Sequence, residues 1–115
     1  MVKLESLKKS NEFKLALGEK RFHTDFFSIF AAKNFIKPKV KGNLIISFVM
    51  KKKIGNAVKR NKIRRKLKAN VLKIVKIKGA INYNYTYIVF GKPKTYTEKQ
   101  EVLYTAMIGC FKKFK

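Results

Sequence analysis

The sequence predicts an α+β protein, in which helices and a β-sheet share one hydrophobic core, and three observations support this. Short apolar runs rich in aromatic and β-branched residues are typical of strands, while other segments repeat their apolar residues at helical spacing. The length of 115 residues gives room for one domain, over 1–115. A hydrophobic fraction of 46%, with ten Phe and five Tyr, supplies the core material that a disordered basic tail lacks.

A short helix is predicted near the N-terminus. Ser10 is its candidate N-cap, because a serine oxygen can accept a hydrogen bond from a free N–H of the first turn. Phe13, Ala16 and Leu17 follow at the spacing of one helix face, and Gly18 is the expected stop.

Strands are predicted to follow this helix. Phe26–Ala32 and Asn43–Met50 are short, apolar and rich in aromatic or branched residues. The segment Phe22–Thr24 either belongs to the first of these strands or forms a strand of its own. Asn34–Gly42, between the two strands, contains Pro38 and alternating lysines, as expected of a loop or a charged edge.

One more strand and a helix are predicted toward the C-terminus. The strand Tyr85–Phe90 is closed by Gly91 and Pro93. Thr97 and Gln100 match the T-x-x-Q pattern of a capping box and mark the start of the helix. The apolar residues that follow at helical spacing are Val102, Leu103, Ala106, Met107 and Cys110.

The charge of the chain indicates a polyanionic partner. There are 29 Lys or Arg residues against 6 Asp or Glu, which gives a formal net charge of +23. The codon bias of an AT-rich genome explains 25 Lys against 4 Arg, but the same bias would favour Glu. Instead, the 72 residues Phe26–Thr97 hold 19 Lys or Arg and no carboxylate. We therefore expect a polyanion to relieve the repulsion between these charges.

Composition excludes several other classes of protein. The single Cys110 rules out an internal disulfide and, with the lone His23, a Cys–His zinc site. No apolar run approaches the roughly 20 residues that a membrane span needs, and the N-terminus lacks the apolar region of a signal peptide. The sequence thus predicts a cytoplasmic protein. Charge alone leaves a membrane-surface role open, but such a role favours one amphipathic basic helix over a sheet-rich domain, so no membrane partner is expected.

The long segment from Asn56 to about Lys76 is predicted to be an amphipathic helix. At roughly 100° per residue, its apolar stripe consists of Ile63, Leu67, Val71 and Ile74. Arg60 lies at the edge of this stripe, where its stem can pack while the guanidinium reaches water. A second sector of the helix carries Ala57, Asn61, Arg64, Arg65 and Lys68.

A solvated polar face is the simpler interpretation of this helix, but three observations favour a site for a nucleic-acid backbone. Solvated faces mix charges, because i, i+4 ion pairs stabilise them, whereas this helix has no acid. Lys51–Lys53 lie just before its N-terminal end, where the helix dipole favours anions. Three of the four arginines, Arg60, Arg64 and Arg65, lie in this helix, and the guanidinium fork suits phosphate.

The string KKIGNAVKRNKIRRKLK, from Lys52 to Lys68, closely resembles the RNR signature of the bacterial ribonuclease P protein subunit family. The match is ungapped and includes the G-N-A-V and R-N elements, which a chance basic helix would not reproduce. Lys8–Phe13 resembles the opening helix of the family, and Tyr87–Lys92 resembles the strand after the signature helix. The resemblance covers most of the chain.

The resemblance implies a two-layer αβββαβα sandwich with a left-handed βαβ crossover around the signature helix. It also implies a function, as the protein subunit of a ribonucleoprotein endoribonuclease that removes the 5′ leader of precursor tRNA. The implied partners are the catalytic ribonuclease P RNA and precursor tRNA. Mg²⁺ would act with the RNA subunit, which does the chemistry, while the protein binds that RNA and the single-stranded leader.

By position, the resemblance assigns two sets of residues. Those expected to serve the RNA subunit are Lys52, Lys53, Asn56, Ala57, Arg60, Asn61, Lys62, Arg64, Arg65 and Lys68. Phe13 and Lys92 would border the leader cleft, and Leu17 occupies a position where the family usually has a second aromatic residue. A leucine weakens any base-stacking role there. For Phe13, the alternative is a core residue on a short amphipathic helix.

No residue of the chain is expected to catalyse cleavage. Protein-only phosphodiester cleavage generally uses paired carboxylates with metals, or pairs of histidines. The chain has one histidine, His23, and no acid between Asp25 and Glu98. Two other kinds of RNA binder share its size and charge, a small ribosomal protein and a sequence-tolerant single-strand binder, and the signature string discriminates against both.

Overall fold

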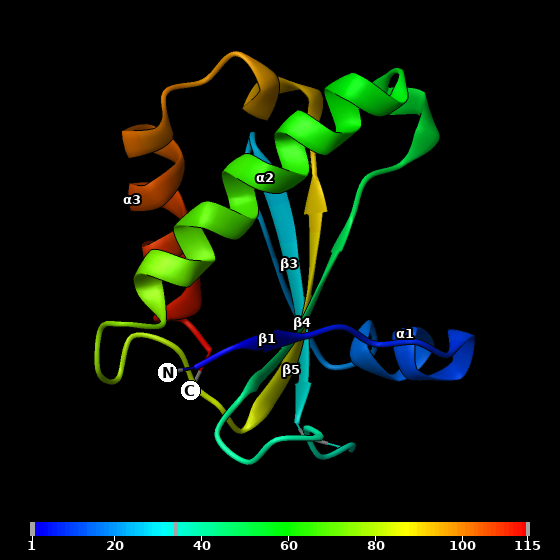
Figure 1. Ribbon diagram of the computed structural model, residues 1–115, viewed down its shortest axis with the longest axis vertical. Helices are drawn as coiled ribbons and strands as arrows, with labels where there is room; N and C mark the ends of the chain where they lie inside the picture. The colour runs from blue at the N-terminus through cyan, green and yellow to red at the C-terminus, as the bar shows by residue number, and fades with distance from the viewer. Residues whose placement is uncertain (1, 34, 115) are drawn as a thin grey trace.

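The computed structural model describes residues 2–33 and 35–114 and contains a five-stranded mixed sheet with three α-helices (Figure 1). Asn34, the first residue of the predicted loop, lies outside the described residues. The strands are β1 (Leu4–Glu5), β2 (Lys20–His23), β3 (Phe27–Lys33), β4 (Leu44–Val49) and β5 (Tyr85–Gly91). The helices are α1 (Ser10–Ala16), α2 (Ala57–Ile74) and α3 (Gln100–Phe111), with 3₁₀ turns η1 (Lys52–Ile54) and η2 (Pro93–Tyr96).

The strands are ordered β1-β4-β5-β3-β2 across the sheet. β4 runs parallel to β1 and β5, whereas β3 runs antiparallel to β5 and β2. α2 therefore connects two parallel neighbours, β4 and β5, as a βαβ unit requires. The predicted order αβββαβα is confirmed, with one addition: the two-residue strand β1, which is too short to leave a periodic signal in the sequence.

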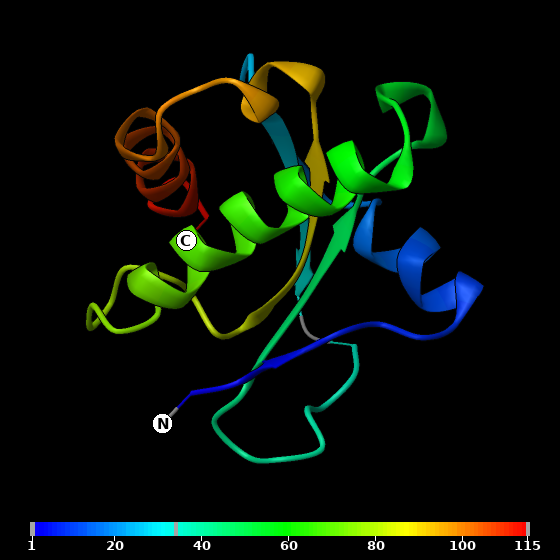
Figure 2. The ribbon, with the colours of Figure 1, turned by 45° about the horizontal axis from the view of Figure 1, so that its top comes forward.

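Alternation along the central strands divides the core between the two faces of the sheet. Ile29 of β3 and Val89 of β5 pack with α2 and α3, whereas Ile88 of β5 packs with Ala16 of α1. Figure 2 shows α2 and α3 on one side of the strands and α1 on the other. The short helix α1 therefore adds a partial third layer to the predicted two-layer sandwich.

The predicted start of α1 is off by one residue. Lys9 is the N-cap and Ser10 is already helical, so the prediction that Ser10 caps this helix is wrong. Instead, the Glu12 carboxylate accepts hydrogen bonds from the N–H groups of Lys9 (3.1 Å) and Lys8 (3.2 Å). An acid in the first turn thus binds the backbone before the helix, in place of a serine that binds the first turn.

The predicted capping box of the last helix is also wrong. α3 begins at Gln100 after the 3₁₀ turn η2, and Thr97 lies outside both elements. The Gln100 side-chain amide donates to the carbonyl of Lys66 in α2 (2.7 Å), so a contact between helices replaces the local cap. The sequence left open whether Phe22 belongs to the strand that follows or to one of its own, and the structure places it in a separate strand, β2.

Candidate nucleic-acid interface

α2 begins directly after Asn56, whose side-chain Oδ1 accepts a hydrogen bond from the N–H of Lys59 (2.9 Å). Gly55, the residue before it, has a φ of 152°, and a Cβ at this position would lie 2.9 Å from the Cδ of Lys59. The G-N pair of the signature therefore defines where the helix starts. This is a structural role for Asn56 in addition to any contact with RNA.

The two sides of α2 differ as the sequence predicts. The stripe residues without exposed surface are Ile63, Leu67, Val71 and Ile74. The side chains that are exposed or half-buried on the outer side include Ala57, Asn61, Arg64, Arg65 and Lys68. The helix carries eight cationic residues and no acid, so its outer side presents positive charge alone.

The arginines of α2 differ in how firmly they are positioned. Arg64 Nη1 donates a hydrogen bond to Asn61 Oδ1 (2.9 Å), one helical turn earlier, which orients the guanidinium. Arg60 is half-buried, as expected from its place at the edge of the stripe. Its Nε is buried and has no hydrogen-bond partner among the residues that the structure describes.

Two lysines of α2 share one aromatic ring. The Nζ atoms of Lys62 and Lys59 lie 4.5 and 5.3 Å from the ring centroid of Tyr96 in η2. Cation–π contacts of this kind are worth about 0.5–1 kcal/mol at exposed sites. Lys62, one of the predicted RNA ligands, is thus held beside η2 before any RNA binds.

Lys66 points into the protein, and sequence reasoning missed this. Its Nζ donates to the carbonyls of Thr95 (2.7 Å) and Glu98 (2.5 Å), with that of Tyr96 at 3.4 Å. Burial lowers the pKa of Lys66, as does the charge of Lys62 nearby, while Glu98 raises it. An ammonium has three donors, so these carbonyls occupy it, and Lys66 fastens α2 to the segment before α3.

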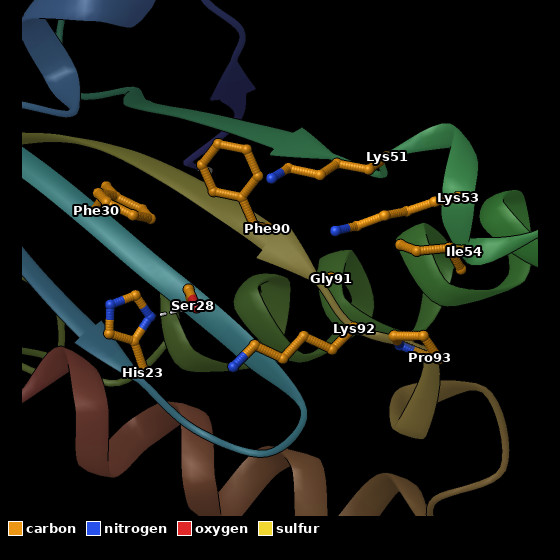
Figure 3. Close-up of a pocket in the computed structure, with 10 residues that line it drawn as sticks. All are labelled: His23, Ser28, Phe30, Lys51, Lys53, Ile54, Phe90, Gly91, Lys92 and Pro93. Carbon is orange, nitrogen blue, oxygen red and sulfur yellow. Dashed lines mark hydrogen bonds between the residues drawn. The ribbon is translucent and has the colours of Figure 1, made fainter.

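A pocket of about 410 Å³ opens on the face of the sheet that α1 partly covers (Figure 3). The register of the strands aligns one row of residues across the sheet at this pocket. His23 pairs with Ser28, Ser28 with Phe90, and Phe90 with Val49, so one row crosses β2, β3, β5 and β4. His23 Nδ1 lies 2.6 Å from Ser28 Oγ, which fixes the imidazole at one end of the pocket.

Aromatic rings and ammonium groups meet in this pocket. The rings of Phe30 and Phe90 pack edge to face, with centroids 5.3 Å apart. The Nζ of Lys51 lies 5.7 Å from the ring centroid of Phe90, and Lys53 extends from η1 into the same space (Figure 3). Bases stack on aromatic faces and phosphates bind ammonium groups, so this combination suits a single-stranded nucleic acid.

Lys92, predicted to border the leader cleft, lines this pocket. Its Nζ donates to the carbonyl of Thr24 (2.6 Å), which holds the side chain along the pocket in the direction of His23 (Figure 3). Two of its three donors are left for a ligand. Lys53, which the resemblance assigns to the RNA subunit, also lines the pocket and lies between the two surfaces.

Phe13 and Leu17, the other predicted cleft residues, do not line the pocket. Phe13 is half-buried and packs against the same buried cluster as Phe30 and Phe90, whereas Leu17 is 37% exposed. Phe30 and Phe90 were not singled out from the sequence. Their signal is the period-2 alternation of the two strands, which places them on the face opposite Ile29 and Val89.

Among residues 2–33 and 35–114, no helix is long and apolar enough to cross a membrane. Within these ranges, no three His, Cys, Asp or Glu side chains come together as a metal-binding group. Cys110 is a free, buried thiol whose pKa is raised by burial.

Comparison with known proteins identifies the family. The family model described as Ribonuclease P matches residues 1–115. The chain belongs to the ribonuclease P protein family. Membership gives the general function: a protein subunit of ribonuclease P, the endoribonuclease that processes the 5′ end of tRNA.

Solved ribonuclease P proteins share this fold. The protein from Thermotoga maritima is 21% identical with a TM-score of 0.75, over 96% of this chain and 98% of that chain. The protein from Staphylococcus aureus is 24% identical with a TM-score of 0.69, over 96% and 94%. A Staphylococcus aureus mutant with defective mRNA degradation activity is 23% identical, with a TM-score of 0.68, over 94% and 86%. Among curated protein sequences, none matches at a significant level.

Proposed function

We propose that this ribonuclease P protein binds two different RNAs on two separate surfaces. The outer side of η1 and α2 binds the catalytic RNA, and the aromatic pocket binds the single-stranded 5′ leader of precursor tRNA. The observation that supports this division is the placement of the two surfaces. α2 packs on one face of the sheet, while the pocket opens on the other face (Figures 2 and 3).

On the helix side, positive charge and guanidinium geometry support the assignment. Arg64 and Arg65 offer paired donors to phosphate oxygens, whereas lysines act as single charges. Small side chains at the helix start leave room for a nucleic-acid backbone. The residues that we assign to the catalytic RNA are Lys52, Asn56, Ala57, Arg60, Asn61, Lys62, Arg64, Arg65 and Lys68, with Lys53 at the border of the two surfaces.

On the pocket side, each type of group has a partner in single-stranded RNA. Phe30 and Phe90 stack on bases, and stacking is worth about 1–3 kcal/mol per base. Lys51, Lys53 and Lys92 bind the phosphates that flank the stacked bases. Phe13 and Leu17, which lie outside the pocket lining, border the path of the leader along α1.

We place Mg²⁺ and the cleavage chemistry with the RNA subunit. Mg²⁺ prefers oxygen ligands, usually carboxylates and phosphates, and the described part of the chain brings no group of three metal-binding side chains together. The protein acts instead by electrostatics, because its cations lower the repulsion between the two RNAs. Less Mg²⁺ is then needed to hold substrate and catalyst together.

Reconstitution with a bacterial ribonuclease P RNA tests this division of roles. The protein should restore cleavage of precursor tRNA at Mg²⁺ concentrations where the RNA alone is inactive. Phe90→Leu keeps apolar volume but removes the ring, so we expect KM to rise about tenfold for a substrate with a long leader. KM for a substrate with a one-nucleotide leader should not change.

Phe35→Leu is the matched control, because Phe35 is an exposed phenylalanine in the β3–β4 loop, outside the pocket. It should leave both substrates unaffected. A protein that binds RNA without stimulating cleavage would contradict the proposal. So would an equal loss with Phe90→Leu for long and short leaders, since the pocket would then not be reading the leader.

A further inference from the structure

A second, smaller pocket of about 180 Å³ opens between the start of α1 and the β3–β4 loop. Its apolar wall includes Ile45, which belongs to the buried cluster under α1. The lysines that line it are Lys8, Lys9, Lys37 and Lys39. They come from two chain segments about thirty residues apart, and none of them belongs to the surfaces described above.

One carboxylate of this pocket holds the loop that carries two of the lysines. Glu5 accepts hydrogen bonds from the N–H groups of Lys39 (2.7 Å) and Val40 (3.1 Å) and from the Asn43 side-chain amide (2.9 Å). These donors lower the pKa of the Glu5 carboxyl, which keeps it ionised. The loop backbone is thus fixed against β1.

The other carboxylate of the pocket holds the segment that carries the remaining two lysines. Glu12 accepts hydrogen bonds from the N–H groups of Lys8 and Lys9, and these donors lower its pKa. Two of the six acids in the chain therefore bind the backbone on either side of one pocket. Both oxygens of Glu5 and the Oε1 of Glu12 accept hydrogen bonds from N–H groups, while the four lysines line the same pocket.

Two of the ammonium groups lie close to one another in this pocket. Lys8 and Lys39 line the same pocket from two different chain segments, and the nearness of the Lys39 ammonium lowers the pKa of Lys8. Glu5 acts in the opposite direction, but its effect is the smallest of those acting on Lys8. The fold thus places two like charges in one small pocket.

We propose that this pocket binds a phosphate group between Lys8 and Lys39. An anion placed between two ammonium groups replaces their repulsion with attraction. Phosphate suits the site because its several acceptor oxygens can take donors from more than one lysine. Glu5 and Glu12 line the same pocket, but they accept hydrogen bonds from backbone N–H groups, and the four lysines outnumber them.

In the ribonucleoprotein, this phosphate belongs to the backbone of the single-stranded leader, a step that rests on the proposed function. Both pockets open on the α1 side of the sheet. Ile46 pairs with Tyr87, so Ile45 lies about four residues from Phe90, or roughly 13 Å along the strands. A leader that continues past α1 from the aromatic pocket therefore reaches the second pocket within a few nucleotides.

The first arm of the test uses the protein alone and inorganic phosphate. The double variant Lys8→Ala/Lys39→Ala is compared with Lys14→Ala/Lys41→Ala, which removes the same charge from α1 and from the same loop but outside the pocket. At constant ionic strength, phosphate should shift the NMR amide signals of Lys9 and Val40 saturably in the wild type and the control. The pocket variant should lose this response while keeping its melting temperature. A response equal in both variants would overturn the phosphate site.

The second arm uses single-stranded RNA oligonucleotides of increasing length. Beyond a threshold length, the wild type and the control should bind about tenfold more tightly than the pocket variant, the effect of a charge-assisted hydrogen bond. The slope of log K against log salt should be about 0.7 shallower for the pocket variant, one phosphate fewer. If phosphate shifted the amide signals but oligonucleotide length had no effect on affinity, the leader would be overturned as the source of the bound phosphate. Free phosphate would then be the ligand. If Phe90→Leu also failed to weaken oligonucleotide binding, the leader site itself would be wrong, whatever the result of the first arm.

Discussion

Gly91 lies at the end of β5, where the strand passes close to α2 and to the residue after β4. A Cβ built at this position would lie 2.7 Å from the Cγ2 of Ile63 and nearer still to the Sδ of Met50. Gly91, Met50 and Ile63 are all buried, so neither neighbour has solvent to move into. Only a residue without a side chain lets β5 approach α2 and place Lys92 at the edge of the aromatic pocket.

Gly91→Ala should lower the free energy of unfolding by about 1–3 kcal/mol, the usual cost of overpacking a filled core. Gly109→Ala is the matched control, because a Cβ there meets nothing within 4 Å and the position lies inside α3. This control should be neutral or stabilise by up to about 1 kcal/mol. Urea denaturation measures both values, and equal stability of the two variants would show that Met50 and Ile63 relax without cost.

Lys66 and Lys68 are both lysines of the signature, but the structure gives them different surroundings. Lys66→Met should lower the free energy of unfolding by about 1.5–3 kcal/mol, because it removes charge-assisted hydrogen bonds to backbone carbonyls. Lys68→Met, at an exposed position, should change stability by less than about 0.5 kcal/mol and weaken RNA binding. Urea denaturation and an RNA-binding titration of both variants separate the two roles. A Lys66 variant with intact stability and weakened RNA binding would mean that its ammonium faces RNA.

At the scale of one element, α2 combines a stable core face with an unfavourable outer face. Like charges at i, i+4, such as Arg60 and Arg64, destabilise a helix. The buried stripe from Ile63 to Ile74 compensates for this, because burying each such side chain contributes about 1.5–3 kcal/mol. The outer side is therefore free to carry charge for a partner.

Replacing Arg64 and Arg65 with Ala should weaken binding of the catalytic RNA and flatten its salt dependence. Each phosphate contact contributes about 0.7–0.9 to the slope of log K against log salt, so the double variant should lose about 1.4–1.8. The matched control is Lys73→Ala/Lys76→Ala, two exposed lysines, one in the last turn of the helix and one just after it. Binding titrations between low and high salt measure the slopes. An unchanged slope in the arginine variant would place the RNA on another surface.

At the scale of the molecule, a dense apolar core holds together a chain with a net charge of +23. The carboxylates are few, and Glu5 and Glu12 bind backbone N–H groups. Repulsion among the cations therefore remains in the folded protein. Anions that bind only the folded form should relieve it.

The melting temperature should rise with added sulfate or phosphate, because ligands of the folded state shift the unfolding equilibrium. Sodium chloride at the same ionic strength is the control, since it screens charge without occupying phosphate sites. The rise should exceed that in chloride, as measured by thermal denaturation. A melting temperature that responds equally to sulfate and chloride would show that screening accounts for the whole effect.

Much of the fold followed from local patterns. The apolar stripe of α2 and the strands β3, β4 and β5 were predicted nearly to their bounds, and the apolar residues of α3 were predicted from their helical spacing. Period and composition suffice for this because they depend on neighbours in sequence. The details that failed are the caps of two helices. Ser10 has the right chemistry for a cap, but Glu12, two residues further on, binds the backbone before the helix instead. At Thr97, local propensity yields to a tertiary contact, from Gln100 to Lys66.

The candidate interface also combines features that the sequence predicts with features that depend on the tertiary structure. An acid-free basic helix, its arginines and its signature can be read from one continuous stretch, because they lie on one element and need no other. The aromatic pocket needs the register that aligns His23, Ser28, Phe90 and Val49 across four strands. Lys66 is removed from the basic surface, and Lys8 and Lys39 come to line one pocket, only when distant segments pack together. Periodicity tells which side of an element is buried, but the packing of the whole chain selects which distant residues meet there.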